Sequence, residues 1–261
     1  MPNKNAIDPE TSLTPRQRSL LFAIIRDYCD SGIGVGSKEL KDKYGFEFSS
    51  ATIRGEISKL RDLGYLYQPF TNSSSQPTEK AFKVFINQLI VGLQVTSRQQ
   101  QDLKKQIMDM EDKQVNLHKE ISRLLAVQTG AVGFSVNQNT ENISGIKNLL
   151  LTNPSESKVS DILDFLDNLD SYKGHLLNQQ KQLPDKRTNS KEKNDLTTFI
   201  GGENPILPLG DGYAMVATEV YVDNQKTVIG LITPVHVLAR KKNLELMQTI
   251  SKVLSKKDAE E

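Results

Sequence analysis

Apolar side chains recur at the spacing of one helix face from Leu20 to Tyr28, which predicts a first helix near the start of the chain. Thr14 suits the N-cap of this helix, Pro15 its first position and Gln17 its third, because a cap hydroxyl pairs with a Gln or Glu three residues later. Gly32 follows the last apolar position and is expected to end the helix.

Two shorter helices and a hairpin are predicted next. Ser37 is expected to cap a helix over 38–44, and Ser49 a helix over 50–63, since each hydroxyl stands directly before a helical pattern. Aromatic and apolar residues alternate over 65–70 as in a short strand, and the small polar residues that follow predict the tip of a hairpin. Three helices followed by a hairpin is the element order of a winged helix-turn-helix domain.

A heptad pattern runs from Phe82 to Leu124, where mostly apolar positions alternate steps of four and three residues. We expect one long helix or two nearly continuous ones. A strict 3.5-residue period favours a facing helix and therefore a coiled-coil stalk of a dimer, while the alternative is a helix that packs on its own domain. The residues expected at the dimer seam are Leu93, Leu103, Ile107, Met110, Leu117, Ile121 and Leu124.

The last third of the chain has the pattern of a small α/β module. β-Branched runs on both sides of Asp223 and Asn224 indicate a hairpin. The predicted elements are a strand at 131–136, short helices at 146–151 and 159–169, strands at 213–222 and 226–233, and a closing helix from about 240 to 254.

Composition narrows the class of protein. With 261 residues, 37% hydrophobic and 25% charged, the chain is long enough for one or two domains. A net charge of +1 excludes a uniformly basic coat but allows a local basic face. No apolar run is long enough to span a membrane, and the first ten residues lack the apolar stretch of a signal peptide. We therefore expect a soluble cytoplasmic protein without a membrane partner.

Catalytic and metal chemistry is poorly supported. His118, His175 and His236 lack ligand spacing, and His118 is expected to be solvated on a polar helix face. The single cysteine, Cys29, excludes a disulfide framework and is expected to be a buried structural thiol. The stretch 201–204 is not followed by the Lys-Ser or Lys-Thr of a phosphate-binding loop. We expect no enzyme activity, no cofactor and no metal.

The third predicted helix instead suits DNA recognition. Ile53, Ile57 and Leu60 share a buried face, so the opposite face carries Ala51, Gly55, Ser58 and Asp62. The small residues on that face allow close approach to a major groove. Arg54 beside them can reach a guanine edge or a phosphate. Hydroxyls at the starts of the second and third helices can contact phosphates, although they can also serve only as caps. The residues expected at the DNA from this pattern are Ser37, Lys38, Ser49, Ser50, Ala51, Thr52, Arg54, Gly55, Ser58 and Lys59.

Several ordered motifs resemble one known family. The stretches 13–17, 35–40, 49–54 and 63–66 together resemble the N-terminal domain of the heat-inducible transcription repressors called HrcA. Three later stretches, at 144–150, 200–205 and 228–234, are similar to the GAF-like domain of that family.

The resemblance implies an α+β fold and a function. The fold would comprise a winged helix-turn-helix, a long linker helix and a reduced C-terminal GAF-like α/β domain. The family binds an inverted-repeat operator as a homodimer, represses chaperone operons and depends on the GroE chaperonin. The resemblance also adds Thr71, Thr78 and Lys80, in the wing, to the expected DNA contacts. The expected domains are a tail at 1–12, the winged helix-turn-helix at 13–81, the helical linker at 82–127, the GAF-like domain at 128–255 with a loop at 181–195, and a tail at 256–261.

Three departures from the family pattern leave alternatives open. Gly55 replaces an Asn that can read adenine, and Ser74 and Ser75 replace Gly and Arg in the wing. The chain is also shorter, because it skips GAF-like strands and a dimerisation insert between Val136 and Glu141. We hypothesise that the heptads take over the dimer contact. The alternatives are a protein-interaction adaptor or a ligand-sensing regulator with altered or lost operator specificity.

Overall fold

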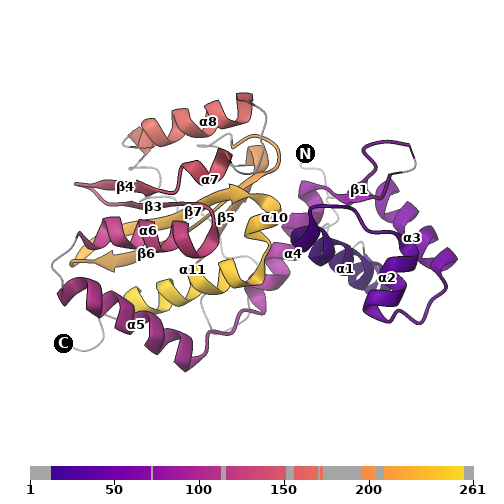
Figure 1. Ribbon diagram of the computed structural model, residues 1–261, viewed down its shortest axis with the longest axis horizontal. Helices are drawn as coiled ribbons and strands as arrows, with labels where there is room; N and C mark the ends of the chain where they lie inside the picture. Colours follow the sequence, from indigo (N-terminus) through magenta and orange to yellow (C-terminus); the bar gives the residue numbers. More distant parts are fainter. Residues whose placement is uncertain are drawn as a thin grey trace, which may run out of the picture. The chain divides into compact units, whose positions relative to one another are not determined.

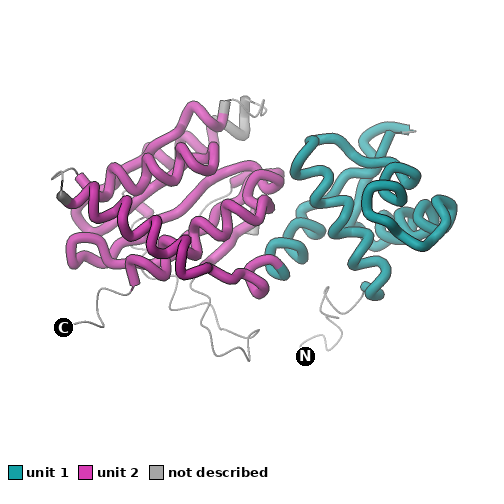
Figure 2. Tube along the Cα trace, turned by 60° about the horizontal axis from the view of Figure 1, so that its bottom comes forward, with its two compact units in different colours: residues 1–88 teal, residues 89–261 magenta. Residues whose placement is uncertain are grey.

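The computed structural model describes residues 13–71, 73–112, 116–150, 156–169, 171–172, 196–203 and 209–255. The chain divides into two compact units, residues 1–88 and 89–261 (Figure 2). The tails expected at 1–12 and 256–261, the loop expected at 181–195 and His175 lie outside the described residues.

The first unit has the predicted order of three helices and a hairpin (Figure 1). The strands of the hairpin are short and antiparallel, with Leu66 opposite Pro77. The elements are α1 (Pro15–Ser31), α2 (Ser37–Tyr44), α3 (Ser50–Asp62), β1 (Leu66–Tyr67), β2 (Gln76–Pro77) and α4 (Glu79–Val91).

The helix starts in this unit follow local hydrogen bonding. The capping box of α1 is confirmed, since Thr14 Oγ1 accepts the Gln17 N–H at 3.2 Å and Gln17 Oε1 accepts the Thr14 N–H at 3.0 Å. Ser49 caps α3 as predicted. The prediction for Ser37 is wrong, because Gly36 is the N-cap of α2 and Ser37 is already helical.

Buried side chains from α1, α2, α3 and α4, together with Tyr65 before β1, form the core of this unit. Cys29 is buried, as predicted. At Gly34 a Cβ atom would lie 2.7 Å from the carbonyl oxygen of Ser75, so only glycine lets the α1–α2 loop approach the hairpin this closely. The main core residues are Leu20, Leu21, Ile24, Ile25, Leu40, Ile53, Leu60, Tyr65 and Ile86.

The prediction of one long helix or two nearly continuous ones is wrong, because three separate helices occupy that span. These are α4, which ends at Val91, α5 (Ser97–Asp112) and α6 (Leu117–Thr129). A capping box starts α5: the Thr96 N–H donates to Gln99 Oε1 at 2.9 Å, and Thr96 Oγ1 accepts the Gln99 N–H at 3.2 Å. The side chain of Asn116 caps α6.

The heptad residues of α5 and α6 pack against other elements of the same chain. The apolar stripe of α5 packs on α11 (Lys241–Leu254), and that of α6 packs on the sheet of the second unit. Each helix therefore buries its stripe without a second chain. Of the seven residues expected at a dimer seam, Met110 and Leu124 are half-buried, and the buried ones are Leu93, Leu103, Ile107, Leu117 and Ile121.

The second unit is a five-stranded antiparallel sheet with helices on both faces (Figure 1). In spatial order the strands are β4, β3, β7, β6 and β5. Helices α7 and α8 cover one face, and α6 and α11 cover the other, with α5 packed against α11 and α6. The bounds are β3 (Val132–Val136), β4 (Glu141–Ser144), α7 (Lys147–Leu150), α8 (Glu156–Asp167), β5 (Thr197–Ile200), β6 (Tyr213–Val222), β7 (Gln225–Pro234) and α10 (Val235–Leu238).

The predicted elements of this unit are confirmed within a few residues at their ends. Asp223 and Asn224 have φ values of 50° and 58°, which is the geometry of a two-residue hairpin turn between β6 and β7. Gly133 faces α6, where a Cβ would lie 2.3 Å from the Ser122 carbonyl oxygen, so glycine lets the helix lie against the sheet. The opposite face carries an apolar core that includes Phe134, Met215, Ile232, Leu149, Ile162 and Phe165.

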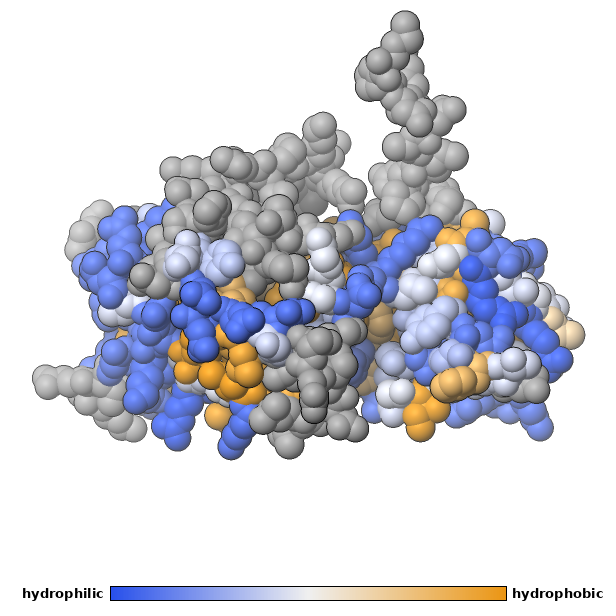
Figure 3. All heavy atoms as spheres, turned by 90° about the horizontal axis from the view of Figure 1, so that it is seen from above, coloured by the Kyte–Doolittle hydropathy of each residue, from blue (hydrophilic) through white to orange (hydrophobic). Residues whose placement is uncertain are grey.

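Hydrophilic residues dominate the described face of the molecule shown in Figure 3, with smaller hydrophobic patches between them. Among the described helices, none combines the length and hydrophobicity needed to cross a membrane.

Candidate nucleic-acid interface

Helix α3 presents the exposed face that the sequence predicts. Ile53, Ile57 and Leu60 are buried in the core of the first unit, while Ala51 and Gly55 are exposed on the other side of the helix. A Cβ built on Gly55 would meet no heavy atom within 4 Å. The surface here is therefore open and nearly free of side chains, which suits close approach of another molecule.

Charged residues flank this open face. Arg54 is exposed, and Lys59 is exposed and forms an ion pair with Glu56 at 3.1 Å. The side chain of Lys59 is 63% exposed and that of Glu56 is 12% exposed, so the ammonium group of Lys59 also remains open to solvent. Ser58 is half-buried on the same side of the helix.

Hydroxyl groups gather at the first turn of α3. Ser49 Oγ accepts the Thr52 N–H at 3.1 Å and lies 2.9 Å from Thr52 Oγ1. Both side chains are exposed, and Ser50 is half-buried between them in the chain. The cap therefore occupies part of their hydrogen-bonding capacity and leaves the rest directed at solvent.

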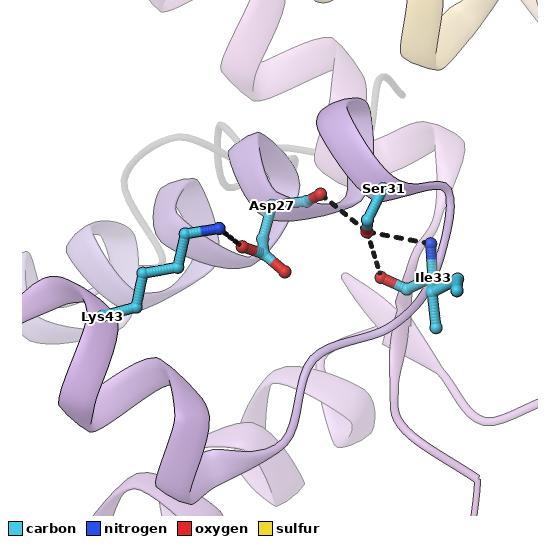
Figure 4. Close-up of polar contacts among 4 residues, drawn as sticks. All are labelled: Asp27, Ser31, Ile33 and Lys43. Atoms are coloured by element: carbon cyan, nitrogen blue, oxygen red, sulfur yellow. Dashed lines mark hydrogen bonds and ion pairs between the residues drawn. The ribbon is translucent and has the colours of Figure 1, made fainter.

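The start of α2 adds one cation. Lys38 is exposed, and Ser37 is half-buried at the first helical position. Helices α2 and α3 pack against each other. An ion pair between Lys43 and Asp27 joins α2 to α1, and the hydrogen bond within it raises the pKa of Lys43 (Figure 4).

The residues in and after the hairpin that are expected to contact DNA differ in their surroundings. Thr71 is exposed. Thr78 Oγ1 instead donates to the carbonyl oxygen of Gly64 at 2.8 Å, and Lys80 Nζ donates to that of Leu63 at 2.8 Å. Thr78 and Lys80 therefore tie the start of α4 to the end of α3, a structural role that the sequence motif does not reveal.

The hairpin tip is built by its own hydrogen bonds. Gln68 accepts from Arg61 of α3 and donates to the Ser73 carbonyl oxygen at 2.7 Å. The Phe70 N–H donates to Ser73 Oγ at 3.1 Å. Ser75 is buried beside Gly34. In this chain position 75 supports the hairpin and presents no side chain to a ligand.

The predicted solvation of His118 is wrong. Its side chain is buried between α6 and the sheet, where Nδ1 lies 3.0 Å from Ser135 Oγ and Nε2 lies 3.2 Å from Asn137 Nδ2. The prediction failed because it placed His118 on an isolated stalk helix, whereas α6 packs on the sheet. Across the described ranges, no three His, Cys, Asp or Glu side chains gather where they would hold a metal ion.

The sequence patterns did not single out Arg16 as a cation of this region. The Cζ atom of Arg16, in the first turn of α1, lies 4.5 Å from the centroid of the Phe48 ring. Phe48 directly precedes Ser49, the cap of α3.

Comparison with known proteins identifies relatives of the chain. The heat-inducible transcription repressor HrcA of Staphylococcus haemolyticus is 38% identical over 114 residues, which is 44% of this chain and 33% of that protein. The one from Lachnoclostridium phytofermentans is 34% identical over 117 residues, 45% of this chain and 33% of that protein. The aligned part thus spans only a third of these relatives' length.

A solved structure and a family model each match a larger part of the chain than these two alignments do. A crystal structure of a hypothetical protein at 2.2 Å resolution covers 94% of this chain and 99% of its own, with a TM-score of 0.67 and 15% identity, so the two share a fold. The family described as the HrcA protein C-terminal domain matches residues 69–238. The chain therefore belongs to the HrcA family.

Proposed function

We propose that this chain is a DNA-binding transcription repressor of heat-inducible chaperone operons. The observation that carries the proposal is the exposed, nearly side-chain-free face of α3 around Gly55, flanked by Arg54 and Lys59, in a chain of the HrcA family. Relatives named heat-inducible transcription repressors support the regulatory role.

In this proposal α3 enters the major groove with its open face forward. Ala51 and Gly55 bring the helix backbone close to the base edges, and Arg54 reaches a guanine edge or a neighbouring phosphate. Ser49, Thr52 and Lys38 hold phosphates at the N-terminal end of the helix. Thr71 in the hairpin contacts the DNA backbone beside the groove. No catalytic step is required.

The lack of a side chain at Gly55 shapes the expected specificity. An Asn at this position of the family can pair with adenine through two hydrogen bonds, and Gly55 makes neither. The operator should therefore tolerate changes at the base pair under Gly55 more than at the base pair under Arg54.

The proposal includes a homodimer, because an inverted repeat has two equivalent half-sites. The buried heptad residues do not supply its interface, so we place the dimer contact elsewhere on the chain. A cytoplasmic location and regulation by the GroE chaperonin are further parts of the proposal, and both derive from the family resemblance.

Hydroxyl-radical footprinting on a duplex with the family's inverted repeat tests this proposal. We expect protection of both half-sites, separated by about one helical turn or a multiple of it. Protection of neither half-site, at protein concentrations that bind random duplex, would contradict operator recognition. Protection of one half-site would contradict the homodimer alone.

A further inference from the structure

Arg16 and Phe48 form a cation–aromatic contact in the first unit, where Lys80 Nζ also lies 4.3 Å from the ring centroid of Tyr65. The Cζ atom of Arg16 lies 4.5 Å from the ring centroid of Phe48, closer than that of Arg26 to Phe85, which is 6.0 Å. Phe48 directly precedes Ser49, the cap of α3, and adjacent Cα atoms are about 3.8 Å apart. An arginine of α1 is thus held next to the proposed DNA-binding helix.

A row of aromatic rings holds Phe48 in place. Its ring stacks on Phe46 with centroids 6.2 Å apart and an interplanar angle of 23°, and Phe46 in turn lies 6.2 Å from Tyr44. All three rings are half-buried along the connection between α2 and α3. The row fixes the ring on which Arg16 rests, so the position of the guanidinium is set before any ligand arrives.

The chemistry of this contact leaves Arg16 able to bind an anion. A guanidinium that stacks on a ring uses its flat face, while its five N–H donors point outward in the plane. Arg16 is exposed, and within the described parts of the chain it forms no ion pair with Asp or Glu. A planar fork of donors matches the oxygens of a phosphate.

We propose that Arg16 is a DNA-phosphate contact that extends the interface from α3 onto the first turn of α1. This inference rests on the proposed function. Preorganisation by Phe48 lowers the entropy that Arg16 loses on binding. Because a phosphate carries no sequence information, Arg16 adds affinity for every duplex and leaves the choice of operator to α3.

The matched pair of variants Arg16→Ala and Arg26→Ala tests the proposal. Both arginines are exposed on α1 and both face an aromatic ring, but Arg26 lies about 15 Å further along the helix axis. Fluorescence anisotropy would give Kd for the inverted-repeat duplex and for a scrambled duplex over a salt series. Thermal unfolding of each variant would show whether it remains folded.

We expect Arg16→Ala to weaken binding of both duplexes about three- to tenfold, and to reduce the slope of log K against log salt by about 0.9. Arg26→Ala should keep both the affinity and the slope. Arg16→Ala with an unchanged slope would overturn the proposal and leave Arg16 only its packing role. If the unaltered chain binds neither duplex, the proposed function fails, and the Arg16 proposal fails with it.

Phe48→Leu tests the positioning separately. This variant keeps an apolar side chain but removes the flat ring, so Arg16 loses its support. We expect a partial loss of affinity with the salt slope retained. When Phe48→Leu is combined with Arg16→Ala, the loss should not exceed that of Arg16→Ala alone, because the two residues act as one unit. Additive losses would contradict positioning of Arg16 by Phe48.

Discussion

His118 Nδ1 lies 3.0 Å from Ser135 Oγ, in a buried polar network between α6 and the sheet. The amide nitrogen of Asn137 serves both His118 Nε2, at 3.2 Å, and Gln225 Oε1, at 2.9 Å. Because this nitrogen can only donate, Nε2 accepts and Nδ1 carries the proton that Ser135 receives. The network requires neutral histidine and joins the turn after β3 to the first residue of β7.

The stability of the second unit should therefore depend on pH. Burial lowers the pKa of His118 below its ordinary 6.5, and a smaller effect of Asp223 opposes this. Below pH 6.5 the unfolded chain then binds more protons than the folded chain. The contribution of neutral His118 to the free energy of unfolding is therefore fully present above about pH 7, and it is lost as the pH drops from 6.5 through the folded-state pKa. Urea unfolding at a series of pH values would show this decline.

His118→Gln separates this effect from those of the other ionisable groups, including His236, whose pKa burial also lowers. The variant should be less stable at neutral pH by about 1–2 kcal/mol, because network hydrogen bonds are lost. It should also lose less stability on acidification than the unaltered chain. An equal decline in both proteins would show that His118 does not titrate with folding.

Arg54→Ala should weaken operator binding by about 1–3 kcal/mol without a change in helix content. Arg54 is exposed, so its removal leaves no cavity and no unpaired buried group. The loss should be larger for the operator than for a scrambled duplex, which distinguishes Arg54 from Arg16. Anisotropy would measure the affinities and circular dichroism the helix content. An unchanged operator affinity would remove Arg54 from the interface.

Gly55→Ala should change stability and DNA binding in opposite directions. The new methyl group meets no atom within 4 Å, and alanine favours an exposed helix interior over glycine by about 1 kcal/mol. The free energy of unfolding should therefore rise. Operator affinity should fall, because the methyl group occupies the closest surface to the groove. A stabilised variant with undiminished affinity would show that α3 does not approach DNA through Gly55.

Leu103→Ala should destabilise the single chain by about 2–5 kcal/mol. Leu103 is 4% exposed on the stripe of α5 that packs on α11, so the loss should be independent of protein concentration. Met108→Ala on the same helix, where the side chain is 53% exposed, should cost less than about 0.5 kcal/mol. An unfolding midpoint that rises with concentration only while Leu103 is present would restore the coiled-coil interpretation.

Local chemistry made much of the fold predictable. The capping box at Thr14 and the turn at Asp223 and Asn224 are specified by neighbouring residues, and both are confirmed. The apolar face of α3 was also predictable, because Ile53 and Leu60 lie on one side at helical spacing.

The wrong predictions of a long helix and of a solvated His118 depended on packing partners distant in the chain, whereas the misplaced cap at Ser37 was a local error of one residue. A 3.5-residue period does not say whether a helix faces another chain or its own sheet, and the capping box at Thr96 was the local signal that the helix ends. His118 followed the same rule. The DNA contact expected of Lys80 stays a prediction, although its hydrogen bond also depends on a distant partner. The bonds of His118 to Ser135 and of Lys80 to Leu63 appear only when the elements meet.

The ratio of two dissociation constants tests the central claim most directly. Anisotropy at a fixed, near-physiological salt concentration would compare the inverted-repeat operator with a scrambled duplex of the same length and composition. We predict that the operator binds at least about 10³-fold more tightly, as expected for specific recognition by α3. Equal affinity for the two duplexes would contradict the account.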